Sequence, residues 1–298
     1  MNALAYAPRA RLFEDFIIVE GITRAGKFLA AVVVSAFEGV EPVQYSPNLE
    51  SLLVLHRLGK VDMPTAKLLL EMEFDIRAFD MAMGRYLNTR PDDMSSVFRS
   101  PDHENVLARA KELDRDALLA RFHAEKRLPL HLYHEGLPHA RALFGVFPKA
   151  RVVSSLRDPA ALMNSWYNRG WGKLGTAESP TVMWPFFQTA KGMRTWWSVD
   201  WAEDWSEIND MDRCALSIAS LYELGRRELE ECAPALRERI HFLRFEDLVR
   251  DPLPRSRASG GSWAARPCRA WPGRSSRSAF PGKSRRVCAR GISNASSA

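Results

Sequence analysis

The strongest constraint on the fold of this chain is a strand, a glycine loop and a helix that follow one another near its start. Residues 15–20, DFIIVE, are apolar enough for a short buried strand, and they run directly into the loop GITRAGKF at 21–28. The next stretch, KFLAAVVVSAF, is apolar nearly all round, which is typical of a buried helix. This order predicts an α/β unit, and it is the context in which a glycine loop binds phosphate.

The loop nearly matches the phosphate-loop pattern GxxxxGK[ST], but Phe28 stands where that pattern has a hydroxyl residue. In kinases and NTPases this hydroxyl is a ligand of Mg²⁺. Arg157, not the aspartate of a second metal site, follows the later apolar stretch VVSSL. An ATP-dependent kinase or NTPase therefore remains an alternative, although these two features count against it. A second alternative is that the loop is a plain strand-to-helix turn that binds no ligand. The loop otherwise predicts a phosphate site that needs no metal.

The chain as far as residue 253 alternates apolar strands with helices. Strands are expected at 40–45, 150–156 and 240–245, and helices at 48–58, through most of 64–127, around 138–147, at 158–167 and at 211–232. Asn48 and Asp158 are the expected N-caps of two of these helices. The alternation predicts a parallel sheet with helices on both faces, in one domain spanning 1–253.

Residues 254–298 differ from the rest in charge and composition. From Arg255 onward the chain has nine Arg, one Lys and no acidic residue, whereas the remainder has 32 basic and 36 acidic residues. The net charge of +6 is therefore confined to one segment, and it does not indicate nucleic-acid binding by the whole chain. A segment so poor in apolar residues is expected to be disordered. It is either the product of a shifted reading frame or a basic tail that binds an acidic partner.

Composition excludes several other classes. No apolar run reaches the roughly 18 residues of a membrane span, and no secretory signal is recognised at the start, so a cytoplasmic location is expected. The four cysteines lack CxxC spacing, which indicates neither a zinc site nor a disulfide framework. No metal is expected, and the sequence does not predict an oligomeric state.

Three segments, in this order, resemble the sulfotransferase family that uses 3′-phosphoadenosine 5′-phosphosulfate (PAPS). They are GITRAGKF, then VVSSLRDPAALMNSWYNRG with Arg157 and Ser165 eight residues apart, then FLRFEDLVRDP. The resemblance covers residues 15–252 and implies a P-loop NTPase-like sulfotransferase fold. It also implies transfer of a sulfuryl group from PAPS, without a metal, to a hydroxyl or amine of a small-molecule or carbohydrate acceptor.

The same resemblance implies roles for individual residues. Arg24 matches the basic residue that stabilises charge as the sulfonate leaves, and Arg157 and Ser165 match the pair that binds the 3′-phosphate. Ala25 departs from the usual serine, and Lys27 and Phe28 replace two hydroxyl residues. The implied PAPS-binding set is Gly21, Thr23, Arg24, Ala25, Gly26, Lys27, Phe28, Arg157 and Ser165.

The base that takes the acceptor's proton is not fixed by the sequence. Members of the family use a histidine or a glutamate as this base, and Glu50 and His134 are the first candidates here. Together with Arg24 they are the expected catalytic residues. His131, Glu135 and His139 remain alternatives.

Two further features bear on function. A Trp-rich stretch at 183–205 is interpreted either as an acceptor-binding cap or as an aromatic packed subdomain. No segment matches the late RKGxxGDW-like loop of the family. A catalytically impaired, truncated homologue that binds a nucleotide or a partner is therefore an alternative to the enzyme.

Overall fold

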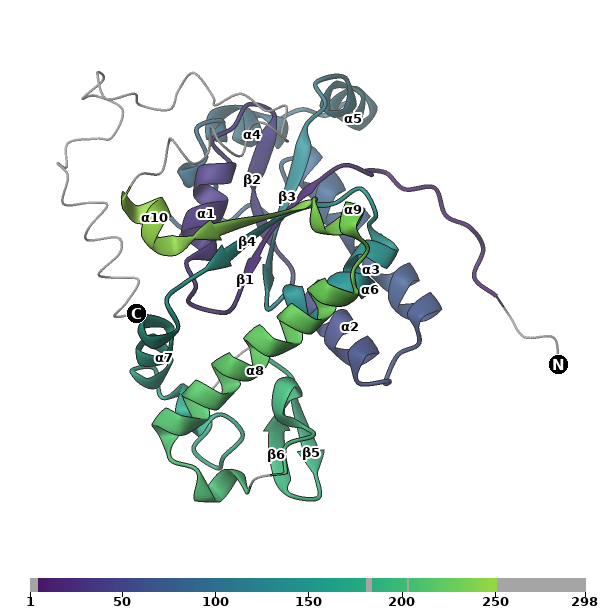
Figure 1. Cartoon of the computed structure of the whole chain (residues 1–298). Coiled ribbons are helices and arrows are strands. Elements are labelled where there is room, and N and C mark those ends of the chain that lie inside the picture. The colour runs from purple at the N-terminus through teal and green to yellow at the C-terminus, as the bar shows by residue number, and fades with distance from the viewer. Residues whose placement is uncertain (1–4, 181–183, 203, 251–298) are drawn as a thin grey trace.

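A five-stranded parallel β-sheet forms the centre of the computed structural model, which describes residues 5–180, 184–202 and 204–250 (Figure 1). The strands lie in the order β2–β3–β1–β4–β7, and every neighbouring pair is parallel. Their bounds are β1 Ile17–Gly21, β2 Val40–Tyr45, β3 Leu128–His134, β4 Arg151–Leu156 and β7 Ile240–Arg244. The predicted α/β class with a parallel sheet is confirmed. The predicted tail at 254–298 lies outside the described residues.

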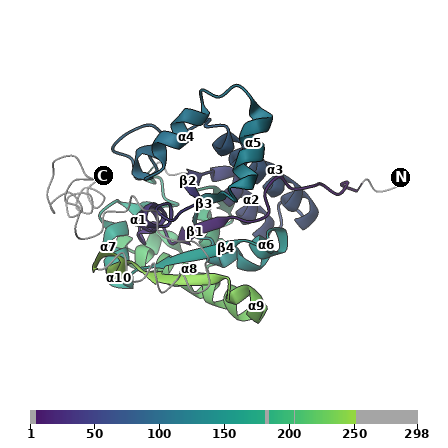
Figure 2. The same ribbon diagram turned by 90° about the horizontal axis from the view of Figure 1, so that it is seen from above.

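Helices cover both faces of this sheet (Figures 1 and 2). One face carries α1 and α10, and the other carries α3 and α6, with α2 beside them. The helices are α1 Lys27–Val34, α2 Pro47–Arg57, α3 Met63–Ala82, α4 His103–Arg109, α5 Arg115–Ala124, α6 Ala140–Val146, α7 Pro159–Tyr167, α8 Asp210–Glu231, α9 Pro234–Arg237 and α10 Phe245–Arg250. Covering of both faces is what an all-parallel sheet requires, since each strand then buries all of its side chains.

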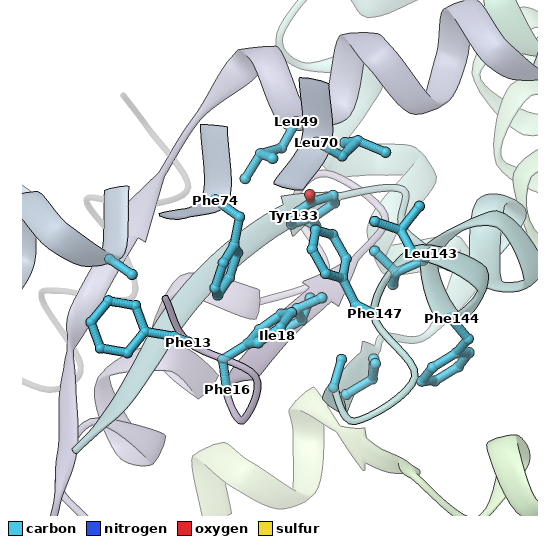
Figure 3. Close-up of a cluster of buried hydrophobic side chains, with 14 of the residues drawn as sticks. Phe13, Phe16, Ile18, Leu49, Leu70, Phe74, Tyr133, Leu143, Phe144 and Phe147 are labelled. Atoms are coloured by element: carbon cyan, nitrogen blue, oxygen red, sulfur yellow. The ribbon is translucent and has the colours of Figure 1, made fainter. Parts of the chain in front are cut away.

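The alternation of side chains along β1 divides the core in two. Ile17 and Val19 pack against α1 and α10, whereas Ile18 points into a second cluster beneath α2, α3 and α6. Figure 3 shows this second cluster, in which the ring of Phe74 lies 3.9 Å from that of Phe16 and 5.3 Å from that of Phe147 between centroids. The sheet is thereby fixed from both sides, and the loop after β1 is held on a rigid strand.

The strand β3 was absent from the sequence prediction, although it lies next to β1. Its sequence, LPLHLYH, combines a proline with two histidines, which are not typical of a buried strand. Leu130 and Leu132 point into one core cluster, and Tyr133 and His131 are buried on the other side. A prediction based on hydrophobicity does not recognise this strand, because it does not expect a histidine to be buried as an uncharged imidazole.

Helix boundaries differ from the predictions in two places. The helical pattern at 64–127 is divided into α3, α4 and α5, with a short 3-10 turn at Val97–Arg99. The helix α2 begins at Pro47 after Ser46, so Asn48 lies inside the helix and the predicted cap is wrong. The Asp158 cap of α7 is confirmed, because its carboxylate accepts a 2.8 Å hydrogen bond from the Ala161 N–H.

The Trp-rich stretch forms a small hairpin and several 3-10 turns beside α8. Strands β5 Phe186–Thr189 and β6 Gly192–Thr195 pair antiparallel, separately from the main sheet (Figure 1). The indole of Trp184 lies 5.7 Å from that of Trp166 and 5.2 Å from that of Trp197 between centroids. These contacts support the packed-subdomain interpretation of the stretch.

The order of the strands marks where a ligand is expected. The connection after β1 runs toward β2, and the connection after β4 runs in the opposite direction toward β7. The carboxyl ends of β1 and β4 therefore form the switch point of the sheet, where open α/β folds bind ligands. Within the described part of the chain, no helix is both long and apolar enough to cross a membrane.

Candidate functional site

The glycine loop lies at this switch point, between β1 and α1. Gly21 has φ +154°, and a Cβ there would approach the Ser155 carbonyl oxygen of β4 to 2.6 Å. The Ser155 hydroxyl donates a 2.7 Å hydrogen bond to the Ala25 carbonyl on the same loop. The loop is thus pressed against β4, and the glycine is required for this close approach.

Gly26 sets the start of α1 and contacts the third sequence motif. Its φ is +92°, and a Cβ there would lie 2.2 Å from Cδ2 of Phe245. Phe245 begins α10, and its ring also faces the guanidinium of Arg157 at 4.8 Å. Glu246 accepts a 2.9 Å hydrogen bond from the Asp158 N–H. The first residues of α10 therefore support both the loop and the start of α7.

The first turn of α1 presents free backbone donors. Within the part of the chain that the structure describes, the N–H groups of Lys27, Phe28 and Leu29 have no protein acceptor, and the first bonded amide is that of Ala30, 3.1 Å from the Gly26 carbonyl. Such groups, together with the helix dipole, favour an anion at this end. The start of α1 therefore offers donors to an anion.

Arg24, Arg157 and Ser165 are brought together beside the loop. Arg24 Nε donates to Ser165 Oγ at 3.3 Å, and Arg157 Nη1 donates to the Arg24 carbonyl at 2.8 Å. Burial lowers the pKa of Arg24 to about 10, and the charges of Arg169 and Arg157 contribute to this lowering. Three guanidinium groups thus lie close enough to repel one another, which a bound anion would relieve.

Arg169 was not among the sequence candidates. It follows α7 at the end of the quoted motif, and its guanidinium lies 5.9 Å from the ring of Trp171. The signal that could have found it is its place within VVSSLRDPAALMNSWYNRG, two residues beyond the end of α7, a helix that begins next to Arg157. No spacing rule singles it out, because its approach depends on the turn after the helix.

Lys27 lies at the start of α1 with only 2% of its surface exposed. Burial lowers its pKa to about 8, against the opposing charges of Glu135, Glu50 and Glu20. In the described structure its ammonium makes no ion pair within 4.0 Å, although three carboxylates act on it from further away. Phe28 behaves differently, since its ring packs against the core cluster and lies edge-on to His134 at 6.2 Å.

Glu50 and His134, the first base candidates, form one hydrogen-bonded pair. Glu50 Oε1 lies 2.7 Å from His134 Nδ1 and accepts from the His134 N–H at 2.5 Å, and the Tyr45 hydroxyl donates to Oε2 at 3.1 Å. Burial raises the pKa of Glu50 to about 8 and lowers that of His134 to about 3. The Glu50 carboxyl group can therefore take up or release a proton near neutral pH, while the imidazole beside it stays uncharged. The catalytic role of the pair stays a prediction.

Glu135, an alternative base, is bound to the loop instead. Its Oε1 accepts from the Thr23 N–H at 2.7 Å and from the Thr23 hydroxyl at 2.6 Å, and its Oε2 accepts from Trp184 Nε1 at 3.0 Å. Its φ is +52°, a strained conformation for a residue with a side chain. Glu135 therefore positions Thr23 and links the loop to the Trp-rich stretch.

The two remaining histidine candidates lie away from the loop. His131 is in the core, 4.6 Å from the ring of Phe74 between centroids, and its ring nitrogens have no partner within the described residues. His139 packs on Trp196 at 4.9 Å and lines a cavity of about 630 Å³ between α2, α6 and α8. Neither is placed where it could take a proton at the loop.

Comparisons with known proteins gave matches among solved structures. No family model matches the sequence, and no curated protein matches it. The sulfotransferase domain from the curacin biosynthetic pathway is similar at 14% identity, with a TM-score of 0.43, over 85% of this chain and 73% of that one. The sulfotransferase domain of the olefin synthase of Synechococcus PCC 7002 is similar at 14% identity, with a TM-score of 0.42, over 87% and 76%. A sulfotransferase from Mycobacterium avium is similar at 16% identity, with a TM-score of 0.36, over 86% and 64%.

Proposed function

We propose that this chain is a sulfotransferase that moves a sulfuryl group from PAPS to a hydroxyl or amine acceptor. The observation that carries the proposal is the meeting of two different groups at one switch point. Arg24, Arg157 and Ser165 are linked by hydrogen bonds beside the free amides of α1, and the Glu50–His134 pair lies against the same first turn through Phe28. The first group suits a phosphorylated donor, and the second suits removal of a proton from an acceptor.

The residues of the loop fit a doubly anionic nucleotide. Free N–H groups at the start of α1 and the buried ammonium of Lys27 would hold its 5′-phosphate. Lys27 supplies a charge where the family pattern has hydroxyl groups, so Phe28 is free to pack into the core. PAPS would supply the sulfuryl group, whose sulfur–oxygen bond to the phosphate breaks as a bond to the acceptor forms. Arg24 neutralises the charge that develops on the phosphate side.

The Glu50–His134 pair would manage the acceptor's proton. Ionised Glu50 takes the proton as the acceptor attacks, and the neutral ring of His134 keeps the carboxylate in place through Nδ1. The Tyr45 hydroxyl holds the other carboxylate oxygen. His134 itself is a weak base because burial lowers its pKa to about 3. Glu50 is therefore the group we assign as the base.

Nucleotide binding provides the first test. We expect adenosine 3′,5′-bisphosphate to raise the melting temperature of the full chain with and without chelator, because no step at this site calls for Mg²⁺. ATP with Mg²⁺ is the comparison. Stabilisation by Mg-ATP alone would indicate a kinase or NTPase, and stabilisation by neither nucleotide would contradict the proposal.

Arg24 provides the second test. Arg24→Ala is expected to lower kcat for sulfuryl transfer about 100- to 1,000-fold, the usual cost of losing one donor that acts in the transition state. Arg24→Lys keeps the charge and should recover part of the rate. Arg90→Ala is the matched control, since the Arg90 side chain is 79% exposed and far from the loop in sequence. Full activity of Arg24→Ala would remove this residue from the mechanism.

A further inference from the structure

A cavity of about 630 Å³ lies between α2, α6 and α8. Its walls come from the end of α2, the segment that leads into α6, the 3-10 turn Trp196–Ser198 and the second half of α8 (Figure 1). Small-molecule sites in proteins have volumes of roughly 300 to 1,000 Å³, so this cavity has the size of a ligand site. Among the described residues, its lining includes neither the glycine loop nor the Glu50–His134 pair.

Two indole rings separate the cavity from the glycine loop. Trp197 lines the cavity, and its ring centroid lies 6.0 Å from that of Trp166. Trp166 Nε1 donates a 2.8 Å hydrogen bond to the Thr23 carbonyl of the loop. A molecule in the cavity would therefore lie on the far side of these rings from the place proposed for the nucleotide.

Part of the lining is apolar and accessible. It comes from four half-buried side chains, Leu58, Met63, Val199 and Leu224. Contact with an apolar ligand would remove their accessible surface from water, and this favours binding. The cavity can therefore hold the apolar body of a small molecule.

His139 adds a buried polar group to the same lining. The residue is only 5% exposed, and its ring packs on Trp196 at 4.9 Å. Within the described ranges, neither of its ring nitrogens makes a hydrogen bond with the protein. Burial lowers its pKa to about 3, so the ring is uncharged at neutral pH and offers one donor and one acceptor. A buried polar ring of this kind, without a protein partner and beside a cavity, points to a ligand.

Arg57 supplies a positive charge at the wall. Its Nη1 donates to the Pro138 carbonyl at 2.8 Å and lies 3.4 Å from Glu228 Oε1. Nε and Nη2 have no hydrogen-bond partner in the part of the chain that is described, and the side chain is 28% exposed. These two donors form the edge of a guanidinium that binds both oxygens of a carboxylate. Glu228 is already paired with Arg141 at 3.0 Å, and Asp200, the other carboxylate of the lining, is exposed to solvent.

We propose that this cavity is a second ligand site, which binds a small organic acid with an apolar body and one carboxylate group. Arg57 binds the carboxylate through Nε and Nη2, His139 forms a hydrogen bond with the ligand, and the half-buried apolar side chains cover its body. One free guanidinium edge matches one carboxylate. The inference does not rest on the proposed function, because the cavity is separate from the loop.

Titration calorimetry of the full chain provides the test, with 2-naphthoate and its neutral analogue 2-naphthamide as probes. We expect one molecule of 2-naphthoate to bind per chain with a Kd below about 1 mM, and 2-naphthamide to bind at least about tenfold more weakly. Arg57→Gln should raise the Kd of 2-naphthoate about tenfold, because a charge-assisted pair is lost, and leave the Kd of 2-naphthamide within about twofold.

Two variants that fill the cavity locate the site. Leu224→Trp adds an indole from α8, and Val199→Trp adds one from the turn that follows β6, so each should weaken both probes at least about tenfold. Leu216→Trp is the matched control, since Leu216 is on α8, is 42% exposed and lies outside the lining. The melting temperature of each variant shows whether it is folded, and the Arg57→Gln comparison does not depend on either filled variant.

Four results would overturn the inference. The first is that 2-naphthoate gives no binding signal up to its solubility limit. The second is that it binds folded Leu224→Trp and Val199→Trp as it binds the wild type. The third is equal binding of the two probes with no effect of Arg57→Gln, and the fourth is displacement of 2-naphthoate by adenosine 3′,5′-bisphosphate. Failure of the bisphosphate to bind at all would contradict the proposed function and leave this inference intact.

Discussion

As the base that we propose, Glu50 would make sulfuryl transfer dependent on pH in a defined direction. Its carboxyl group can accept a proton only when ionised, and burial raises its pKa to about 8. Below that value the ionised fraction grows about tenfold for each pH unit, and above it the fraction is constant. We therefore expect kcat/KM for sulfuryl transfer to rise with pH and to level off above about pH 8. A rate profile between pH 5.5 and 9.5 measures this.

Two variants connect that profile to the pair. Glu50→Gln should remove the rising limb and lower the rate about 100- to 10,000-fold, the range for a general base. Tyr45→Phe removes a donor to the Glu50 carboxylate that lowers its pKa, so the rising limb should move to higher pH while Tyr45→Phe keeps its plateau rate. An unchanged profile in both variants would exclude Glu50 as the base.

Single residues also show which contacts of the site a sequence motif can predict and which it cannot. Arg24, Arg157 and Ser165 stand at recognised positions, and the structure places them in contact. Arg169 has no recognised position, since its approach to Arg24 depends on the turn that ends α7. The bond from Thr23 to Glu135 was equally hidden, because 112 residues separate the two in sequence.

At the scale of elements, α1 depends on α10 through one glycine and one aromatic ring. Gly26→Ala would place a Cβ 2.2 Å from Cδ2 of Phe245, at a φ of +92°. We expect it to lower the free energy of unfolding by about 2 to 4 kcal/mol, partly from overlap and partly from backbone strain. Phe245→Ala removes the overlapping ring, so Gly26→Ala should cost at least about 0.5 kcal/mol less in that background. Urea denaturation of the four proteins measures the coupling, and additive costs would show that the strain is all in the backbone.

Two of the predicted strands carry a local signal that the missed strand lacks. Strands β1 and β4 contain runs of β-branched residues, Ile17–Val19 and Val152–Val153, so their sequences resemble buried strands. The strand β3 contains His131 and Pro129, and its place in the sheet follows from tertiary packing that no local pattern encodes. The position of the site at the ends of β1 and β4 was predictable from the motifs. The order of the strands was not, because it depends on β3.

For the whole molecule, buried titratable groups set the pH of greatest stability. Burial lowers the pKa of His131, His134 and His139 from 6.5 to about 3, so the unfolded chain binds more protons at these sites between those values and stability rises with pH there. Burial raises the pKa of Glu20 to about 7 and that of Glu50 to about 8, from 4.5, so the folded chain binds more protons there and stability falls as pH rises through that window.

These opposing slopes predict a maximum in the free energy of unfolding near pH 6.5. Below it the three histidines outweigh the two carboxyl groups, and just above it the carboxyl groups dominate. From about pH 8 Lys27 opposes them, because its pKa is lowered from 10.5 to about 8 and the unfolded chain then binds more protons at this site. Urea denaturation of the ligand-free chain at intervals from pH 4.5 to 8.5 measures the curve. His131→Leu should flatten the acidic side and leave stability at pH 7 equal or higher, because both ring nitrogens of His131 lack partners within the described residues. Leu130→Ile, on the same strand and without a titratable group, should lower the whole curve without changing its shape. An acidic slope that is the same in His131→Leu as in the wild type would mean that burial of this imidazole does not govern the acid stability of the fold.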